Sequence, residues 1–175
     1  MPRDVRWTTW ASSTPIIDYR QYWDELPNGD IHLFFHSFSL RERLRKANGD
    51  ADNQVMLVQA ADAPGGFSTT NPVLTDACWS PTNQKIVEKQ VNGIGTTKCN
   101  TYYPVWPSPR QVAGASVAND IIKCRLRPLT RSDYKVKLTS AQWKALRQTF
   151  RGGVCDWSAQ GVGQQRPAGS WPTFP

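Results

Sequence analysis

Two histidines and two aspartates in the first quarter of the chain have side chains that could carry out general acid–base catalysis. His32 and His36 lie in GDIHLFFHSFS, and Asp24 and Asp30 precede them. A histidine acts as a general base when a carboxylate orients its ring and a nucleophile lies within reach. Asp24 or Asp30 followed by His32 has the chain order of acid and base in α/β-hydrolase folds. We therefore take His32, Asp30 and Asp24 as the candidate catalytic residues. The alternative is that His32 and His36 only satisfy hydrogen bonds of local turns.

The serine that such a reaction needs is not evident in the sequence. No GxSxG is present, and the nearest pattern, GASVA around Ser116, follows a Pro-rich loop rather than a strand. If the chain takes part in acyl transfer, we expect the Ser nucleophile on another polypeptide.

The two histidines give only a weak pattern for a metal site. His32 and His36 are four residues apart, as zinc ligands on one helix face are, but no Glu lies between them as in HExxH. The sequence therefore predicts neither a metal nor another cofactor.

The elements that must position these residues follow a strand–helix–strand order. TPIIDYRQY and NQVMLVQA are compact apolar runs that predict buried strands. Between them, Ser39 and Glu42 form a capping box that predicts the start of a helix, and Gly49 predicts its end. We expect residues 1–60 to form a strand–helix–strand piece of an α/β sheet, and residues 61–175 to form a disulfide-tied C-terminal extension.

The expected extension contains three further elements. IIKCRL reads as a strand, and DYKVKLT alternates as an exposed edge strand does. SAQWKALRQTF predicts a helix that begins at a capping box of Thr139 and Gln142 and ends at Gly152.

The chain has four cysteines, at spacings of 21, 25 and 31 residues, and their pairing indicates the redox state of the protein's compartment. No CxxC is present and neither histidine is near a cysteine, which argues against structural zinc. An even number of cysteines suits two disulfides, for which three pairings exist. We favour Cys78–Cys99, which flank a hairpin-like run, and Cys124–Cys155, because Cys155 follows a helix and can fold back onto the IIKCRL strand. Two disulfides predict an oxidising compartment, periplasmic or extracellular, whereas four reduced thiols are the alternative.

Charge is unevenly distributed along the chain. Residues 1–88 carry a net charge of −3 and residues 89–175 a net charge of +10. A basic half can bind nucleic acid, dock on an acidic half or be solvated. No aromatic-basic RNA-binding pattern or zinc-finger spacing is present, so we expect no nucleic-acid partner, and we interpret the stripe Lys144, Arg147 and Arg151 as a solvated helix face. No apolar run approaches the roughly 18 residues needed to span a membrane.

Four segments together resemble one protein family. They are GDIHLFFHSFSLRERLRKANGDADNQV, DACW, PSPRQVAGASVANDIIKCRLRPL and FRGGVCDWSAQGVGQ. They resemble the C-terminal part of a bacterial family of secreted, tannase-like α/β-hydrolases that is catalogued as a domain of unknown function. The resemblance implies an α/β-hydrolase-like fold whose N-terminal part, with the Ser nucleophile, lies outside this chain. Of the candidate residues, only Asp30 and His32 fall on a segment typical of that family.

Residues and resemblance together predict the C-terminal part or subunit of a secreted ester hydrolase. Its partner would be a second polypeptide that carries the N-terminal part of the fold, and its substrate a small ester or a polymer. The alternatives are a non-catalytic secreted module that binds polysaccharide or an aromatic ligand through its tryptophans, and a structural subunit of an extracellular assembly.

Overall fold

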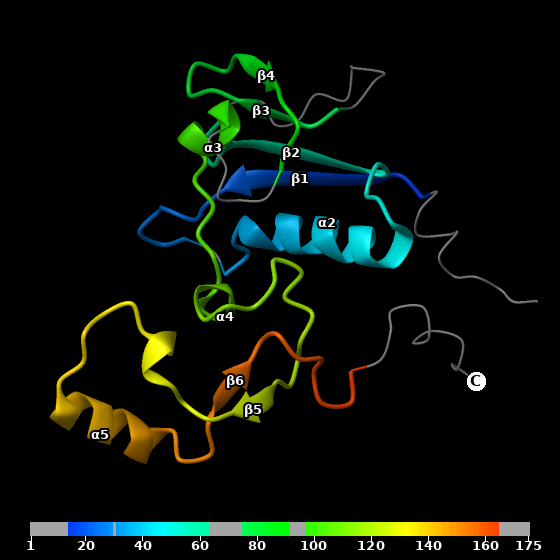
Figure 1. The fold of residues 1–175 in the computed structure, drawn as a ribbon. Helices are drawn as coiled ribbons and strands as arrows, with labels where there is room; N and C mark the ends of the chain where they lie inside the picture. Colours follow the sequence, from blue (N-terminus) through cyan, green and yellow to red (C-terminus); the bar gives the residue numbers. More distant parts are fainter. Residues whose placement is uncertain (1–13, 30, 64–74, 92–96, 165–175) are drawn as a thin grey trace, which may run out of the picture. The chain divides into compact units, whose positions relative to one another are not determined.

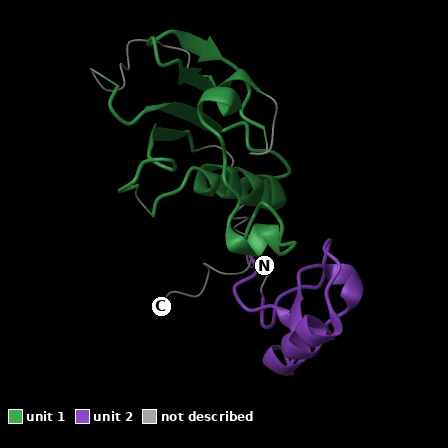
Figure 2. Ribbon diagram, turned by 90° about the vertical axis from the view of Figure 1, so that its left-hand side faces the viewer, with its two compact units in different colours: residues 1–119, 166–175 green, residues 120–165 purple. Residues whose placement is uncertain are grey.

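A computed structural model describes residues 14–29, 31–63, 75–91 and 97–164 of the chain. The chain divides into two compact units, which Figure 2 shows in two colours. Unit 1 contains Met1–Asn119 and Arg166–Pro175, and unit 2 contains Asp120–Gln165. The boundary that the sequence predicts after residue 60 therefore falls inside unit 1, because later strands extend the same sheet.

Unit 1 contains a four-stranded sheet in the order β1-β2-β3-β4 (Figure 1). The strands are β1 (Ile16–Tyr22), β2 (Gln54–Ala60), β3 (Ala77–Trp79) and β4 (Lys85–Val87). The first three strands are parallel and β4 is antiparallel to β3. The predicted strand–helix–strand order is confirmed. The strand β1 differs from its prediction, however, because residues 16–21 alternate between half-buried and exposed, and only its last residue, Tyr22, is buried.

The connection between β1 and β2 is helix α2 (Phe35–Asn48), which runs beside the sheet (Figure 1). The helix begins four residues before the predicted capping box, so that prediction is wrong. Its first residue follows Phe34, whose backbone N–H donates to the carboxylate of Asp24. Ser39 lies inside the helix, is buried, and donates its hydroxyl to the carbonyl of Val117 at 2.7 Å. A long-range carboxylate thus replaces the local cap that the sequence suggested.

The end of α2 agrees with the prediction from the sequence. The helix ends at Gly49, as predicted, in a left-handed conformation with φ of 92° that favours glycine. At the start of α2, the rings of Phe34 and Phe38 pack edge to face, with 5.0 Å between their centroids. The core cluster comprises Tyr22, Phe34, Phe38, Met56, Val58, Cys78, Cys99 and Tyr103.

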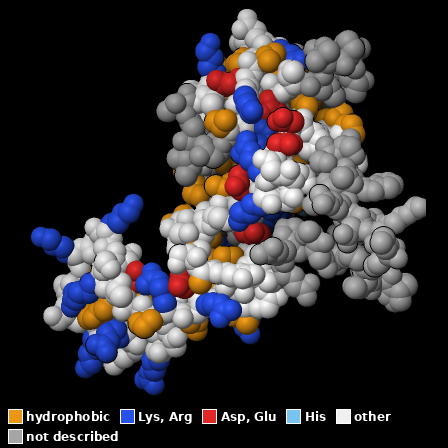
Figure 3. Space-filling model, turned by 45° about the vertical axis from the view of Figure 1, so that its right-hand side comes forward, with side chains coloured by type: hydrophobic (Ala, Val, Ile, Leu, Met, Phe, Trp, Pro, Cys, Tyr) orange, Lys and Arg blue, Asp and Glu red, His pale blue; other side chains and the backbone are white. Residues whose placement is uncertain are grey.

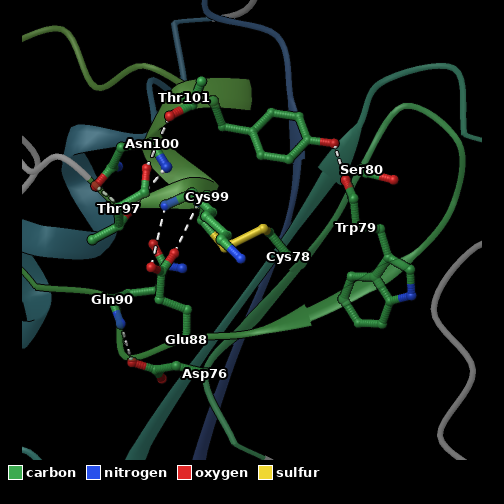
Figure 4. Close-up of a disulfide and its surroundings, with 12 residues drawn as sticks. Asp76, Cys78, Trp79, Ser80, Glu88, Gln90, Thr97, Cys99, Asn100 and Thr101 are labelled. Carbon is green, nitrogen blue, oxygen red and sulfur yellow. Dashed lines mark hydrogen bonds between the residues drawn. A yellow bond between two sulfur atoms is a disulfide. The ribbon is translucent and has the colours of Figure 1, made fainter.

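The disulfide Cys78–Cys99 ties β3 to the short helix α3 (Lys98–Tyr102), as Figure 4 shows. The carboxylate of Glu88 accepts hydrogen bonds from the backbone N–H groups of Lys98, at 3.2 Å, and of Cys99, at 2.9 Å. The predicted first disulfide is confirmed, and both of its cysteines are fully buried. A further short helix of this unit, α4 (Pro109–Val112), begins at a capping box formed by Ser108 and Gln111.

The described part of unit 2 contains a two-stranded sheet, one α-helix and one 3-10 helix. The strands β5 (Arg125–Arg127) and β6 (Val154–Asp156) are antiparallel, and helix α5 (Ser140–Thr149) lies between them in sequence. The predicted second disulfide, Cys124–Cys155, is confirmed, and so is the capping box at the start of α5.

The predicted edge strand in DYKVKLT is wrong. Residues 134–139 belong to no strand, and a 3-10 helix, η1 (Arg131–Asp133), lies just before them. The carboxylate of Asp133 accepts hydrogen bonds from the Arg127 guanidinium and from the Thr130 backbone N–H. These bonds hold the 3-10 turn that precedes the predicted strand. In the part of the chain that the structure describes, no strand pairs with residues 134–139.

The chain is thus a mixed α/β protein with a small sheet and two disulfides. Among the described residues, no helix has both the length and the apolar character that crossing a membrane requires.

Candidate functional site

The candidate residues lie in the segment that joins the carboxyl end of β1 to the start of α2. Asp24 follows Tyr22, the last residue of β1, by two positions, and His32 precedes α2 by three. In open α/β sheets, ligands bind outside the carboxyl ends of the strands. Asp30, the other predicted acid, lies outside the described residues.

Asp24 is half-buried and acts as the acceptor for the start of α2. Its two carboxylate oxygens lie 3.0 and 2.9 Å from the backbone nitrogen of Phe34. Burial raises the pKa of Asp24, and the hydrogen bond from Phe34 and the charge of Arg20 partly oppose this rise. The carboxylate is therefore held in a defined position at the end of the strand.

His32 is exposed, and its backbone carbonyl accepts a hydrogen bond from Arg20. The Arg20 guanidinium donates to the carbonyls of His32 and Leu33, the latter at 3.2 Å. Its Nε donates to the hydroxyl of Ser37 at 3.0 Å, and that hydroxyl donates to Asp18 at 3.1 Å. The sequence reasoning missed Arg20, because it treated β1 as a continuous buried run. The alternation of polar and apolar residues in IIDYRQY is the signal that could have identified Asp18 and Arg20 as neighbours on one face.

His36, which the sequence reasoning left outside the candidate set, lies in the first turn of α2. Its ring packs on Phe35 with 4.0 Å between ring centroids. Burial lowers the pKa of His36, and the positive charges of Arg20 and His32 lower it further. The charge of His36 in turn lowers the pKa of Asp24. The charges of Arg20 and His36 therefore act on Asp24, and those of Arg20 and His32 act on His36.

Two tyrosines join the carboxyl ends of the strands to the segment after α3. The hydroxyl of Tyr22 donates to the carbonyl of Pro104 at 2.7 Å, and the hydroxyl of Tyr103 donates to the carbonyl of Trp79. Burial, and then neighbouring carboxylates, raise the pKa of Tyr22. Burial likewise raises the pKa of Tyr103, and Asp62 after β2 adds to that rise. Both phenols therefore stay protonated near neutral pH and serve as donors.

A separate hollow of about 500 Å³ lies around the start of β2 and the end of α2. Its lining includes Arg41 and Asp76, which form a buried ion pair with 2.5 Å between Arg41 Nη1 and Asp76 Oδ2. None of the predicted catalytic residues lines this hollow. We assign the buried ion pair to the stability of the fold.

The described part of the chain holds no group of three or more His, Cys, Asp or Glu side chains arranged as metal ligands. Among the described residues, His32 and His36 therefore do not belong to such a group.

The chain has a clear family relationship. A family model described as a tannase-like family of unknown function matches residues 7–73 and 68–166. No curated protein and no solved structure matches the chain.

Proposed function

The chain belongs to a tannase-like family of unknown function, and we propose that it forms the C-terminal part of a secreted ester hydrolase with an α/β-hydrolase-like fold. The observation that carries the proposal is the segment after β1. There, a half-buried carboxylate and two histidines gather at the carboxyl end of a parallel strand. This is the edge at which α/β folds bind ligands.

In this proposal, His32 is the general base and a carboxylate of the same segment orients it. Asp24 is one candidate for that acid, and its fixed position at the start of α2 supports the role. Asp30 is the other candidate, two residues before His32 in sequence. The base removes the proton of a serine hydroxyl as the hydroxyl attacks the ester carbonyl, and the carboxylate stabilises the imidazolium that forms.

The serine itself would come from outside this chain, on a second polypeptide that carries the N-terminal part of the fold. The absence of GxSxG from the sequence supports this division of the site. The two disulfides support an oxidising compartment, periplasmic or extracellular. The substrate class in this proposal is a small ester or an ester-bearing polymer.

The proposal is tested by hydrolysis of p-nitrophenyl acetate with and without a co-purifying polypeptide that contains GxSxG. We expect the isolated chain to leave the rate at the buffer value and the complex to hydrolyse the ester. A fluorophosphonate probe should label a serine of the second polypeptide only. Hydrolysis or labelling by the isolated chain would contradict the external serine.

Variants of the complex test the assigned residues. His32→Ala should lower kcat by about 10²–10⁴-fold, the usual contribution of a general base. Asp24→Asn should also lower kcat, because it removes a carboxylate proposed to orient the base. Asp52→Asn is its matched control, because Asp52 is exposed and lies before the amino end of β2. If His36→Ala abolishes the activity and His32→Ala leaves it unchanged, the role assigned to His32 is wrong. Circular dichroism of Asp24→Asn separates loss of chemistry from loss of the α2 start.

A further inference from the structure

Unit 2 has a strong excess of positive charge. Residues 120–165 contain nine Lys or Arg and three Asp, a net charge of +6. Two of the acidic side chains accept hydrogen bonds from nearby residues. Asp133 accepts one from the Arg127 guanidinium at 2.6 Å, and Asp156 accepts one from the Ser158 hydroxyl at 2.5 Å. Figure 3 shows exposed Lys and Arg side chains with apolar side chains between them. The excess charge is therefore carried on the surface of this unit.

Several of these cationic side chains lie around Trp143. Lys144, Arg147 and Arg151 are spaced i, i+3 and i+7, so they follow one side of α5 and its end. From a separate element, η1, the Arg131 guanidinium lies over the Trp143 ring, 4.9 Å from the ring centroid. The stripe that reads as a solvated face in the sequence thus gains a fourth cation and an aromatic ring through the tertiary structure.

The surface around these groups is hollowed, and we call it the α5 basic face. One hollow of about 380 Å³ is lined by Arg131, Ser140, Trp143, Lys144, Arg147, Gln148 and Arg151. A second hollow of about 560 Å³ shares three of these residues, Trp143, Arg147 and Arg151, and adds apolar side chains including Leu126, Leu129 and Phe150. Neither lining contains a carboxylate. Hollows of this size accommodate small ligands or single units of a polymer.

We propose that the α5 basic face binds an acidic polysaccharide through the carboxylates of its sugar residues. Arginine guanidinium groups bind carboxylates with two parallel hydrogen bonds, and Arg131, Arg147 and Arg151 supply three such groups. The Trp143 ring offers an apolar surface for the body of a sugar, while Ser140 and Gln148 offer hydrogen-bonding groups for hydroxyls. Residues 144–149 extend about 8 Å along the helix axis, and Arg151 lies just past the end of the helix, so the face can contact more than one sugar of a chain.

Two observations favour a polysaccharide over a nucleic acid. Two aromatic side chains line the hollows, Trp143 in both and Phe150 in the second only, and cations lie among them. Surfaces for single-stranded nucleic acid instead present successive aromatic side chains for successive bases. The disulfide Cys124–Cys155 lies within this same unit and indicates an oxidising compartment. The proposed binding site is independent of the ester-hydrolase proposal, because its residues belong to unit 2 and the candidate catalytic residues to unit 1.

The test is binding of the full chain to oligogalacturonate, measured by isothermal titration calorimetry at low ionic strength. The double variant Arg147→Ala/Arg151→Ala should bind at least about tenfold more weakly, given the strength of hydrogen bonds to charged groups. The matched control is Lys135→Ala/Lys137→Ala, which removes the same charge from exposed residues of unit 2 that line neither hollow. Its affinity should stay within about twofold of the parent chain, because distant exposed charges are screened. Fully methyl-esterified oligogalacturonate, which has the same sugar backbone without charge, should not bind.

Three results would overturn the proposal. The first is no binding of oligogalacturonate by the parent chain. The second is an equal loss of affinity in both double variants, which would show that only net charge matters. The third is tighter binding of single-stranded DNA of equal charge, which would identify the face as a nucleic-acid surface. Circular dichroism of each variant verifies that the fold is retained.

Discussion

The buried ion pair between Arg41 and Asp76 joins α2 to the segment before β3, and we predict that Asp76→Asn strongly destabilises unit 1. Only 4% of the Arg41 side chain and 10% of the Asp76 side chain are exposed. Asp76 accepts two hydrogen bonds from Arg41, at 2.5 and 2.8 Å, and one each from the backbone nitrogens of Met56 and Gln90. The substitution keeps the shape of the side chain, removes its charge and replaces one acceptor oxygen by a donor group.

The expected loss in the free energy of unfolding follows from the groups that stay buried in the variant. In the variant, the Arg41 guanidinium stays buried without its counter-charge, and an amide NH₂ group faces other donors. Breaking a buried ion pair by removing one partner costs about 3–5 kcal/mol. Small proteins have total stabilities of about 5–15 kcal/mol, so the loss is a large fraction of the total.

Equilibrium urea denaturation under non-reducing conditions measures the change in the free energy of unfolding. The matched control is Glu42→Gln, which breaks the exposed pair of Glu42 and Arg45 on the same helix. We expect that control to cost less than about 1 kcal/mol, as exposed pairs do. A loss below about 1 kcal/mol in Asp76→Asn as well would refute the reasoning. A double-mutant cycle with Arg41→Met should show that the two losses are not additive.

Three further predictions concern unit 2. Gly153→Ala should destabilise it by more than about 1 kcal/mol, because Gly153 has φ of 101° and an added Cβ would lie 2.4 Å from a backbone oxygen of Arg127. Gly152→Ala should be tolerated, because its nearest neighbour would lie at 3.7 Å; equal thermal shifts of the two variants would contradict this. Cys124→Ser opens a disulfide of 31-residue separation and should cost about 3–4 kcal/mol, seen as faster hydrogen exchange throughout unit 2. Hydrogen bonds from Arg127 lower the pKa of Asp133 to about 2, so the stabilisation from this pair is present above the ordinary value of 3.8 and is lost as pH falls toward 2. A carboxyl titration midpoint near 3.8 in an NMR experiment would contradict it.

Local signals in the sequence predicted a substantial part of the fold correctly. The apolar runs around β1 and β2 and the glycine at position 49 predicted a strand–helix–strand unit, because strand and helix periodicity are written in neighbouring residues. The capping box of Thr139 and Gln142 predicted the start of α5 for the same reason. Both disulfide pairings were predicted from the elements on which the cysteines lie.

The candidate site was predictable only in outline. The residue types and chain order of Asp24 and His32 pointed to the segment after β1, and that segment does lie at the carboxyl end of a parallel strand. The alternation in β1 could have placed Arg20 beside Asp18. The hydrogen bond of Arg20 to the segment before α2 and the contribution of His36 were not predictable from spacing, because both depend on how α2 begins.

By itself, the sequence determined the elements whose signals lie within a few residues of one another: the strands of the βαβ unit, the Gly49 helix end and the capped α5. The tertiary structure alone decided features that join distant residues. Asp24 starts α2 ten positions before Phe34, and Asp76 neutralises Arg41 across 35 positions. Arg131 meets Trp143 to form the α5 basic face. Buried charged groups need partners that compensate their charge, and these partners come together only when the chain folds. No pattern of neighbouring residues identifies them.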